Sequence, residues 1–278
     1  MTILSVCIPV SDSGRTLGPS LHSILLQDTD IEVVVLDNAS SDNTGAIADS
    51  FDDPRVRLVR NEEALPVGEN WNKAVSLSHG RFVKVLRSGD ILLAGALDKQ
   101  LEVMGDNGIA LCASQFEILD ERGVVEGTGL GLPGLIGSRD VRTVMRTLVR
   151  RGPAVFGPTG AAMFRRADFD RVGGFRGNLA LPMDVDLFAR VCAFGRFFGM
   201  PEVLAAWRDS TYRLRAEITT VAQLTELLRF QHRLGAEYPE LIGRGAIFSG
   251  DLRLARAAAE RVRGRAAATA MRRPQLRP

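Results

Sequence analysis

Three short segments of this sequence contain aspartates that could bind a ligand or take up a proton. The first is the run 37–44 (DNASSDNT), which directly follows the apolar run 31–36. A carboxylate at Asp37 could accept a hydrogen bond from a nucleobase N–H or a ribose hydroxyl. Ser41 or Asp42 could instead cap the helix that follows, by accepting from its free N–H groups. Capping accounts for Asp42 but not for Asp37, which precedes the cap and could also form a turn.

The second run is 86–90 (LRSGD), which follows another apolar stretch. The carboxylate of Asp90 could bind Mg²⁺ or Mn²⁺, because magnesium-like ions prefer oxygen ligands and keep water and substrate phosphates in their coordination shell. One carboxylate is a weak metal site, and the alternative is that Asp90 caps a helix beginning near Leu92. Residue type and position alone favour the cap.

The third run is 183–187 (MDVDL), at the start of a segment with helical spacing. A carboxylate here could act as a general base if it faces the ligand. Carboxylates also stabilise the first turn of a helix without any further function, and the residues alone favour this interpretation slightly. Asp184 and Asp186 point roughly 200° apart in a helix, so they cannot share one role.

The framework that positions these runs is clearest in the first 113 residues, where apolar runs alternate with segments of helical spacing. Continuous apolar runs predict strands buried on both faces, and their alternation with helices predicts a parallel sheet. The expected strands are 3–8, 31–36, 56–59, 82–86 and 109–113. Ligands of such sheets bind at the carboxyl ends of the strands, which directs attention to residues 9–14, 37–42 and 87–90.

After residue 114 the pattern is weaker. The stretch 123–137 is rich in glycine and predicts a loop. Helices are expected at 138–150, 166–172 and 185–194, and extended segments at 160–164 and 197–207. From residue 219 the sequence predicts helix up to Pro274. The stretch 123–158 has the least regular pattern.

The composition is that of an ordinary folded domain. Of the 278 residues, 45% are hydrophobic and 24% are charged, which excludes disordered, collagen-like and coiled-coil chains. No apolar run reaches the ~18 residues of a membrane span, and the first residues lack the basic stretch of a signal peptide, so a cytoplasmic location is expected. Cys7, Cys112 and Cys192 stand far apart in apolar surroundings, which predicts buried, reduced thiols.

The charge is nearly balanced over the whole chain but not along it. A formal net charge of +2 does not indicate a nucleic-acid partner. Residues 250–278 nevertheless contain eight arginines and two acids. Leu252, Ala255, Ala259 and Val262 form an apolar stripe in this segment, which predicts docking onto the domain or onto a second copy of the chain. Peripheral contact with an anionic membrane is the alternative.

Two common nucleotide-binding motifs are absent from the sequence. A dinucleotide-binding dehydrogenase needs the pattern G-x-G-x-x-G after its first strand, but residues 9–14 (PVSDSG) contain a single glycine. The phosphate-binding pattern G-x-x-x-x-G-K-[ST] is also missing.

An ordered series of segments resembles a known family instead. These segments are 5–10 (SVCIPV), 21–27 (LHSILLQ), 34–44 (VVLDNASSDNT), 70–74 (NWNKA), 80–86 (GRFVKVL), 160–166 (GAAMFRR), 169–175 (FDRVGGF) and 184–190 (DVDLFAR). They are similar to the inverting, family 2-type glycosyltransferases with the GT-A fold. The resemblance covers roughly residues 3–208.

The resemblance implies a donor site for a nucleotide-diphosphate sugar at the sheet edge. The donor-binding residues that it implies are Pro9, Val10, Ser11, Asp37, Ser88, Gly89 and Arg208. In this interpretation the first three line the nucleotide pocket, Asp37 binds the base and Arg208 meets the diphosphate. Asp90 matches the metal-binding acid of the family and Asp184 matches the catalytic base, with Asp186 as a supporting neighbour.

The sequence departs from the family pattern at several places, one of which is the lack of a lysine or arginine in residues 61–71. Gly89 stands where a second metal-binding acid is usual, and Met183 replaces an acid that often precedes the base. The family often ends its last strand with arginine, any residue and histidine, whereas this chain has Arg208-Asp209-Ser210. These departures leave open a nucleotide-sugar-binding protein with little or no transferase activity.

We therefore expect an α/β, GT-A-like domain over residues 1–215, with a mostly parallel sheet, helices on both faces, and a helical C-terminal appendage at 216–278. Residues 1–113 would bind the nucleotide sugar, and residues 114–215 would form the acceptor side. The expected reaction transfers a sugar to an acceptor hydroxyl with inversion, assisted by Mn²⁺ or Mg²⁺. A nucleotidyltransferase on a similar sheet is a third class, but it would need a basic, glycine-rich loop after the first strand.

Overall fold

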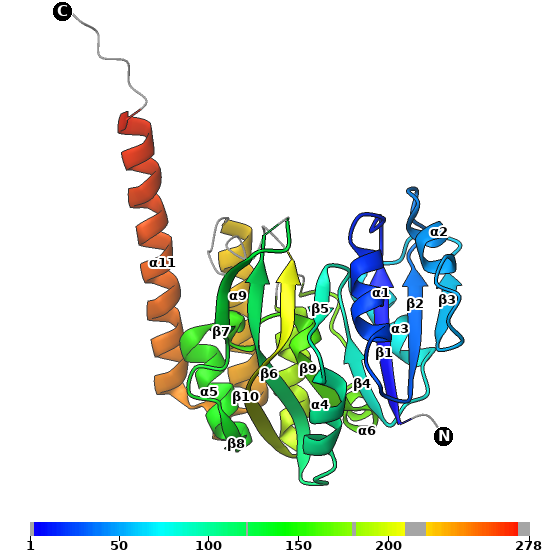
Figure 1. Ribbon diagram of the computed structural model, residues 1–278. Coiled ribbons are helices and arrows are strands. Elements are labelled where there is room, and N and C mark those ends of the chain that lie inside the picture. Colours follow the sequence, from blue (N-terminus) through cyan, green and yellow to red (C-terminus); the bar gives the residue numbers. More distant parts are fainter. Residues whose placement is uncertain (1–2, 121, 180–181, 209–220, 272–278) are drawn as a thin grey trace, which may run out of the picture.

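A single mixed sheet forms the centre of the protein (Figure 1). The computed structural model describes residues 3–120, 122–179, 182–208 and 221–271. The strands are β1 (Leu4–Val10), β2 (Ile31–Asp37), β3 (Val56–Arg60), β4 (Phe82–Val85), β5 (Asp90–Leu92), β6 (Ile109–Leu119), β7 (Val125–Leu130), β8 (Gly137–Arg139), β9 (Ala162–Arg165) and β10 (Arg196–Arg208). Their order is β3-β2-β1-β4-β9-β6-β10-β5, with β7 paired to β6 and β8 paired to β10.

The directions of the strands bring the important loops to one edge. β1 is parallel to β2 and β4, and β6 is parallel to β10. β9 runs antiparallel to both β4 and β6, so these two strands point the same way. The carboxyl ends of β1, β2, β4 and β10 therefore share one edge, the upper edge in Figure 1. The expected α/β fold is confirmed: β1, β2, β3, β4, β6 and β10 run the same way, and β9 and the short strands β5, β7 and β8 run antiparallel to their neighbours.

Helices cover both faces of the sheet, as expected. They are α1 (Leu17–Leu25), α2 (Thr44–Asp49), α3 (Val67–Ser76), α4 (Ala96–Met104), α5 (Val141–Arg151), α6 (Arg166–Arg171) and α7 (Met183–Val191). One core cluster joins α1 and α4 to the sheet through Leu21 and Leu97. The other joins α3, α5 and α7 through Trp71, Leu148 and Phe188. β1 is buried along its whole length between these two clusters, which explains why its sequence is continuously apolar.

The glycine-rich stretch 123–137 is not the expected loop. Residues 125–130 form β7, which pairs antiparallel with β6. The side chains of β7 are exposed or half-buried, so this strand carries no apolar run by which the sequence could show it. The helix expected at 138–150 is present as α5, and Asp140 caps it by accepting a hydrogen bond of 2.8 Å from the Thr143 N–H.

The helical segment expected after residue 219 is present and consists of three helices in the described part of the chain. They are α9 (Val221–Glu237), α10 (Pro239–Ile242) and α11 (Arg244–Met271), separated at Tyr238 and Gly243. α11 packs against α5, and a Cβ added at Gly250 would lie 2.8 Å from the Val149 carbonyl oxygen. Figure 1 shows α11 as a long helix at the end of the molecule farthest from β3.

The apolar stripe expected on the basic segment faces solvent. Leu252, Ala255 and Ala259 are exposed, and the side chain of Val262 lies outside the described residues. The positions that pack are Ala246, Gly250 and Leu254, which follow one another at intervals of four residues. The sequence pattern contains both stripes, and only the contact with α5 decides which one is buried.

The three cysteines are free, buried thiols, as the sequence predicts. Burial raises the pKa of Cys7 and of Cys112 to about 12, so both stay protonated at neutral pH. Of the helices in the described part of the chain, none combines the length and the apolar composition that a membrane crossing requires.

Candidate active site

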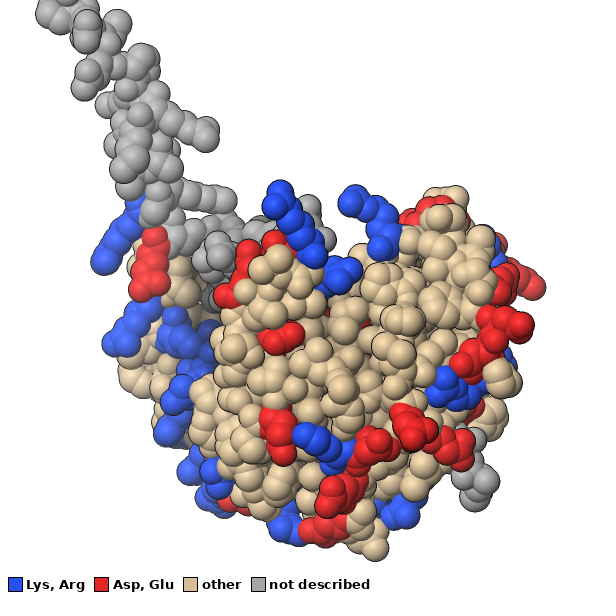
Figure 2. All heavy atoms as spheres, viewed as in Figure 1, with Lys and Arg blue, Asp and Glu red and all other residues tan. Residues whose placement is uncertain are grey.

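The polar runs singled out in the sequence meet at the carboxyl edge of the sheet. Val10, the last residue of β1, pairs with Asp37, the last residue of β2. Asp90 pairs with Trp207 near the end of β10, and the Arg208 N–H donates to the Gly89 carbonyl at 3.2 Å. In Figure 2 the surface is hollowed along this edge, and basic side chains project on both sides of the hollow.

The loop after β1 is fastened to the loop after β2. The Asp12 N–H donates to the Ser40 hydroxyl at 2.9 Å, and the Asp12 carboxylate accepts from the Ser41 N–H at 2.9 Å. Pro9 and Val10 are buried, whereas Ser11 is exposed at the top of this loop. Of the three residues expected to line the nucleotide pocket, Ser11 is thus polar and faces solvent, whereas Pro9 and Val10 belong to β1.

Asp42 joins the same two loops at the start of α2. Its carboxylate accepts from the Thr44 N–H and the Gly14 N–H, each at 2.9 Å. Hydrogen bonds from the Thr44 hydroxyl and the Gly14 N–H hold the pKa of Asp42 below its usual range. The capping role expected for Ser41 or Asp42 is not the one observed, because the N-cap residue of α2 is Asn43, whose side chain makes no cap hydrogen bond. Asp42 precedes the cap and accepts from the N–H of Thr44, the first residue of the helix.

Asp37 is fully buried, and its two carboxylate oxygens differ in their surroundings. Oδ1 accepts from the Ser40 N–H at 3.0 Å and from the Ser40 hydroxyl, which is the turn-forming role left open by the sequence. Oδ2 lies 3.6 Å from a guanidinium nitrogen of Arg60 but has no hydrogen-bond partner among the described residues. Oδ2 is therefore the atom of Asp37 with capacity left for a ligand.

The loop 87–90 takes a shape that depends on glycine. Gly89 has a φ of +111°, and its N–H donates to the Ser20 hydroxyl at 2.8 Å. An acid at this position would be strained, because side chains rarely adopt that backbone conformation. The Ser88 hydroxyl donates to the Ser13 hydroxyl at 2.8 Å, which connects this loop to the loop after β1. Gly89 thus fits the turn that brings Ser88 to Ser13.

Asp90 does not cap a helix. It begins the short strand β5, and α4 begins only at Ala96, so the capping interpretation is wrong. The Asp90 carboxylate is buried and accepts from the Gly160 N–H at 3.2 Å. A Cβ added at Gly160 would lie 2.4 Å from Leu86 Cδ1 and 3.1 Å from Asp90 Oδ2, so only glycine lets the backbone approach this carboxylate.

Asp184 lies in the first turn of α7 and contacts the residue that precedes Gly160. The Thr159 hydroxyl donates to Asp184 Oδ2 at 2.6 Å, and the Val185 N–H donates to Oδ1 at 2.9 Å. Thr159 and Gly160 belong to one short 3₁₀ turn, Thr159–Ala161. Neighbouring residues of this turn therefore hold the two acids, although Asp90 and Asp184 are far apart in the sequence.

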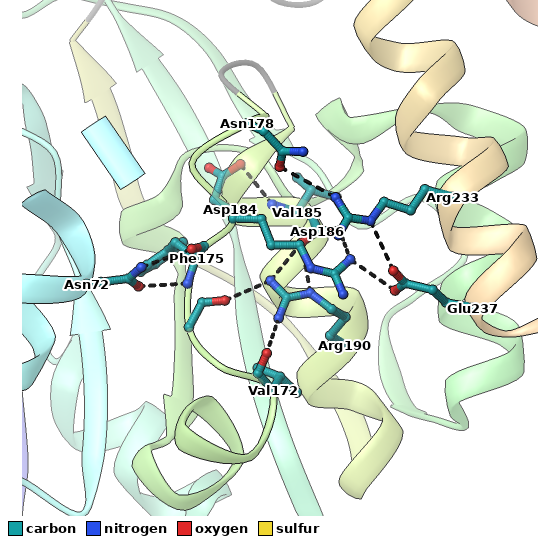
Figure 3. A network of polar contacts seen from close by, with 12 residues as sticks. Asn72, Val172, Phe175, Asn178, Asp184, Val185, Asp186, Arg190, Arg233 and Glu237 are labelled. Carbon is teal, nitrogen blue, oxygen red and sulfur yellow. Dashed lines mark hydrogen bonds and ion pairs between the residues drawn. The ribbon is translucent and has the colours of Figure 1, made fainter. Parts of the chain in front are cut away.

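Asp186 points away from Asp184 and forms buried ion pairs (Figure 3). Arg190 donates to the Asp186 carboxylate at 2.7 Å and to the carbonyls of Val172 and Gly174 at 2.9 Å each. Arg176 approaches Asp186 at 3.4 Å and Glu237 of α9 at 3.0 Å. Asp186 is thus held in ion pairs with arginines, whereas Asp184 accepts hydrogen bonds from a hydroxyl and a backbone N–H.

The carboxyl edge provides few ligands for a metal ion. No group of three His, Cys, Asp or Glu side chains suitable for metal binding occurs in the described ranges. Asp90 stands at the edge without a neighbouring acid, because Gly89 precedes it. This arrangement fits only an ion whose remaining ligands are substrate phosphate oxygens and water, a mode that Mg²⁺ commonly uses.

Several residues at this edge were missed by the sequence interpretation. Thr159 and Gly160 hold the two acids, and Ser13 and Ser20 hold the loop 87–90. A lone lysine, Lys84, lies inside the apolar run 82–86 and is buried. This charge in a strand that is otherwise apolar was a visible signal, whereas the serines and Thr159 resemble ordinary turn residues.

The sequence of the chain identifies its family. The family described as "Glycosyl transferase family 2" matches residues 5–173, which is more than half of the chain. The chain belongs to glycosyl transferase family 2. The matched residues include Asp37, Asp90 and the turn at Thr159, and they end before Asp184.

Relatives of this glycosyltransferase occur among bacterial proteins. It is 30% identical over 224 residues to an uncharacterized protein of Mycobacterium tuberculosis, MT1568, with 75% of this chain and 67% of that protein covered. It is 32% identical over 124 residues to the Escherichia coli protein WfgD, a UDP-Glc:alpha-D-GlcNAc-diphosphoundecaprenol beta-1,3-glucosyltransferase. That alignment covers 44% of this chain and 49% of WfgD, so the chain spans about half the length of this relative.

Solved structures share the GT-A-like fold of this glycosyltransferase. S. aureus TarS (residues 1–349), solved with UDP-GlcNAc, aligns with a TM-score of 0.63 at 16% identity and covers 84% of this chain and 66% of its own. The mannosyltransferase PcManGT from Pyrobaculum calidifontis, solved with GDP-Man and Mn²⁺, aligns with a TM-score of 0.59 at 20% identity. This second alignment covers 98% of the present chain and 81% of PcManGT.

Proposed function

We propose that this glycosyltransferase transfers a sugar from a nucleotide-diphosphate sugar to an acceptor hydroxyl, with inversion at the anomeric carbon. The observation that carries the proposal is the turn at Thr159–Gly160, which holds Asp90 on one side and Asp184 on the other. A carboxylate for the leaving diphosphate and a carboxylate for the attacking hydroxyl are the two acids that such a displacement requires. The structures of TarS with UDP-GlcNAc and of PcManGT with GDP-Man support the donor class.

In this proposal the loops after β1 and β2 hold the nucleotide. The orphan oxygen of Asp37, Oδ2, accepts a hydrogen bond from the base, while Oδ1 keeps its bonds to Ser40. Ser11 faces the nucleotide from the top of the first loop, beside Pro9 and Val10. Ser88, Gly89 and Arg208 lie together at the next strand ends and face the diphosphate. The Arg208 guanidinium carries a permanent positive charge for that contact.

On the opposite side Asp184 acts as the general base. The acceptor oxygen attacks the anomeric carbon, its proton passes to the Asp184 carboxylate, and the bond from that carbon to the diphosphate oxygen breaks. Direct displacement from the opposite face inverts the anomeric carbon, so no covalent intermediate with the protein is needed. Asp90 would hold Mn²⁺ or Mg²⁺ together with the donor phosphates, and such an ion offsets the charge of the leaving diphosphate.

The proposal is tested by thermal shift with uridine, thymidine and guanosine diphosphate sugars, each with Mn²⁺ and with EDTA. The matched control is the same nucleotide without a sugar. We expect one nucleotide sugar to raise the melting temperature and to be turned over with an acceptor, giving a product of inverted anomeric configuration by NMR. Binding without turnover would favour the alternative of a nucleotide-sugar-binding protein. A product of retained configuration, or no effect of any nucleotide sugar, would contradict the proposal.

We also propose that α11 contacts an anionic membrane surface. Phe248 and Leu252 are 70% and 41% exposed, and with Ala255 and Ala259 they form a solvent-facing apolar stripe on this helix. The arginines Arg244, Arg256 and Arg263, which are exposed on the same helix, suit the phosphates of anionic lipids. An apolar face beside arginines is the pattern of a helix that lies in the membrane interface.

The membrane contact is tested with the double variant Phe248→Ser/Leu252→Ser in co-sedimentation with vesicles. Truncation at Gly250 is unsuitable, because it would remove the buried Leu254. The control is Val221→Ser, which changes an equally exposed apolar residue on α9. We expect the parent and the control, but not the double variant, to bind phosphatidylglycerol vesicles at low salt. No binding by the parent contradicts the proposal, and a self-association that the double variant abolishes would assign the stripe to a second copy of the chain.

A further inference from the structure

A lysine is buried in the sheet directly behind the candidate active site. Lys84 lies on β4 and is 1% exposed. Its ammonium donates to Gln100 Oε1 at 2.6 Å and to the Ala162 carbonyl at 3.3 Å. Within the described residues no carboxylate lies at ion-pair distance from it. Burial of an ammonium group costs free energy unless the group donates hydrogen bonds to several acceptors. The two acceptors of Lys84 therefore indicate which parts of the structure this lysine holds in place.

Both acceptors belong to a short chain of contacts that ends at one turn. Gln100 of α4 is also fully buried, and its Nε2 donates to the Ala161 carbonyl at 2.8 Å. The carbonyls of Ala161 and Ala162 are thus each fixed by a buried side chain, one from a helix and one from a strand. These carbonyls follow directly after Thr159 and Gly160, whose hydroxyl and N–H groups face the two acids.

The turn has little freedom to move because it is held from behind and packed in front. The space for a Cβ at Gly160 is already occupied by Leu86 and Asp90, at 2.4 Å and 3.1 Å. A shift of the backbone at residues 161 and 162 would therefore displace the Gly160 N–H from Asp90 and the Thr159 hydroxyl from Asp184.

We propose that Lys84 and Gln100 are positioning residues for sugar transfer, which fix the turn at residues 159–162 and through it the relative placement of Asp90 and Asp184. The inference rests on the proposed function of these two acids. Neither Lys84 nor Gln100 contacts substrate in this proposal. Their effect reaches the two acids through the backbone of the turn, and for Lys84 also through its electrostatic interaction with Asp90. Gln100 lacks that second route, so its variant isolates the contribution of the turn, which should appear mainly in the turnover step.

Two variants separate positioning from a merely structural role. Lys84→Met keeps the length of the side chain but removes its donor. Gln100→Glu keeps the acceptor for Lys84 and adds an ion pair with it, but removes the donor to the Ala161 carbonyl. A purely structural role predicts that Gln100→Glu is tolerated, whereas positioning predicts that it is impaired.

The matched control is Ser5→Ala on the neighbouring strand β1. Ser5 is fully buried, donates to Glu32 at 2.6 Å and accepts from the Gly80 N–H at 2.7 Å. It lies near the amino end of β1, away from the candidate site. Its removal therefore disturbs buried polar contacts of the same sheet without touching the turn at residues 159–162.

The first measurement is hydrogen exchange of the Gly160 and Ala161 amides in the protein without ligands. Lys84→Met and Gln100→Glu should exchange about tenfold faster at these amides, because the local opening becomes easier, while Ser5→Ala should not. The second is steady-state kinetics with a working donor and acceptor. Misplacement of a catalytic group by about 1 Å can cost about 100-fold in rate, so we expect kcat to fall between about 10- and 100-fold with donor KM within about threefold.

The outcomes of the two measurements are separable. Unchanged exchange at residues 160 and 161 in both variants overturns the inference, even if the enzyme is active. A kcat of Gln100→Glu within twofold of the parent, or an equal loss of kcat in Ser5→Ala, also overturns it. If the parent transfers no sugar from any donor, the proposed function fails, while the exchange result still decides whether Lys84 and Gln100 hold the turn.

Discussion

The donor side and the base side of the candidate site are held together by different kinds of contact. On the donor side, the loops 10–14, 37–44 and 87–90 are fastened by hydrogen bonds of hydroxyl, carboxylate and N–H groups, such as Ser88 to Ser13. On the base side, the buried pair of Asp186 and Arg190 lies within α7, and Arg190 connects this helix to the carbonyls of Val172 and Gly174. The donor loops also follow directly after strands, whereas Thr159 and Asp184 on the base side lie in a 3₁₀ turn and in the first turn of a helix.

This difference predicts which substitutions should affect only ligand binding and which should also lower the stability of the protein. A lost hydrogen bond between donor loops costs about 0.5–1.5 kcal/mol, and its effect should be confined to ligand binding. A buried ion pair that loses one partner leaves an uncompensated charge, which costs several times more. On the base side, therefore, we expect only the substitution of Asp184 to impair catalysis without lowering stability.

The largest effect is expected for Asp184→Asn. Asparagine keeps the shape of the side chain but cannot take up the proton of the acceptor hydroxyl, so kcat should fall by ~10²–10⁴. Donor affinity by calorimetry and the melting temperature should stay close to those of the parent. A turnover rate near that of the parent would place the base elsewhere.

Arg190→Met should chiefly lower stability. It leaves Asp186 buried without its nearest cation, and we expect the free energy of unfolding to fall by about 3–5 kcal/mol, measured by urea denaturation. The control is Arg196→Met, which removes an ion pair to Asp106 whose two side chains are both 49% exposed. That control should cost less than ~1 kcal/mol. Equal losses in the two variants would remove the distinction between the two sides.

On the donor side, Asp37→Ala should weaken nucleotide binding. A hydrogen bond to a charged group contributes about 1.5–3 kcal/mol, which corresponds to about a 10- to 150-fold loss of affinity. Ser40→Ala is the matched control, because it removes a hydroxyl that contacts Asp37 but keeps the carboxylate. Calorimetry that finds the same nucleotide affinity in the parent and in Asp37→Ala would remove Asp37 from the site.

The smallest expected effect concerns Lys84, which lies between the two sides. Burial lowers its pKa from 10.5 to about 8. Between these pH values the unfolded chain binds more protons than the folded chain, so the stability of the parent should rise with pH in this window. Relative to Lys84→Met, the gain from pH 8 to 10.5 should be on the order of 2 kcal/mol. If the free energies of unfolding of the two proteins, measured by chemical denaturation, changed with pH in parallel, Lys84 would not lose its charge in this pH window.

The sequence predicts the donor side better than the base side because its signals are local. β1, β2 and β4 are mostly apolar, and Asp37 and Asp90 lie at the end of such strands or a few residues after them. Asp90, by contrast, accepts not only from the nearby Arg87 N–H but also from the Gly160 N–H, which comes from a segment seventy residues further along. No local pattern near Asp90 announces that contact, and local pattern alone favours the wrong interpretation, a helix cap.

Other failures have the same physical origin. β7 has no buried face, so periodicity could not reveal it. The stripe of Leu252 on α11 and that of Leu254 look alike in sequence, and packing against α5 buries only the second. Lys84 was visible as a charge in an apolar run, but its partners Gln100 and Ala162 could be named only once α4 and β9 had been placed beside β4.

The turn at Thr159–Gly160 makes the two acids thermodynamically dependent on each other. A ligand that draws the Asp90 carboxylate away from the Gly160 N–H must perturb the adjacent Thr159 and hence Asp184. If a ligand at Asp90 changes the affinity of a ligand at Asp184 by some factor, linkage requires that the ligand at Asp184 change the affinity at Asp90 by the same factor. Donor and acceptor would then not bind as independent events, and two neighbouring residues of the backbone would carry the coupling between them.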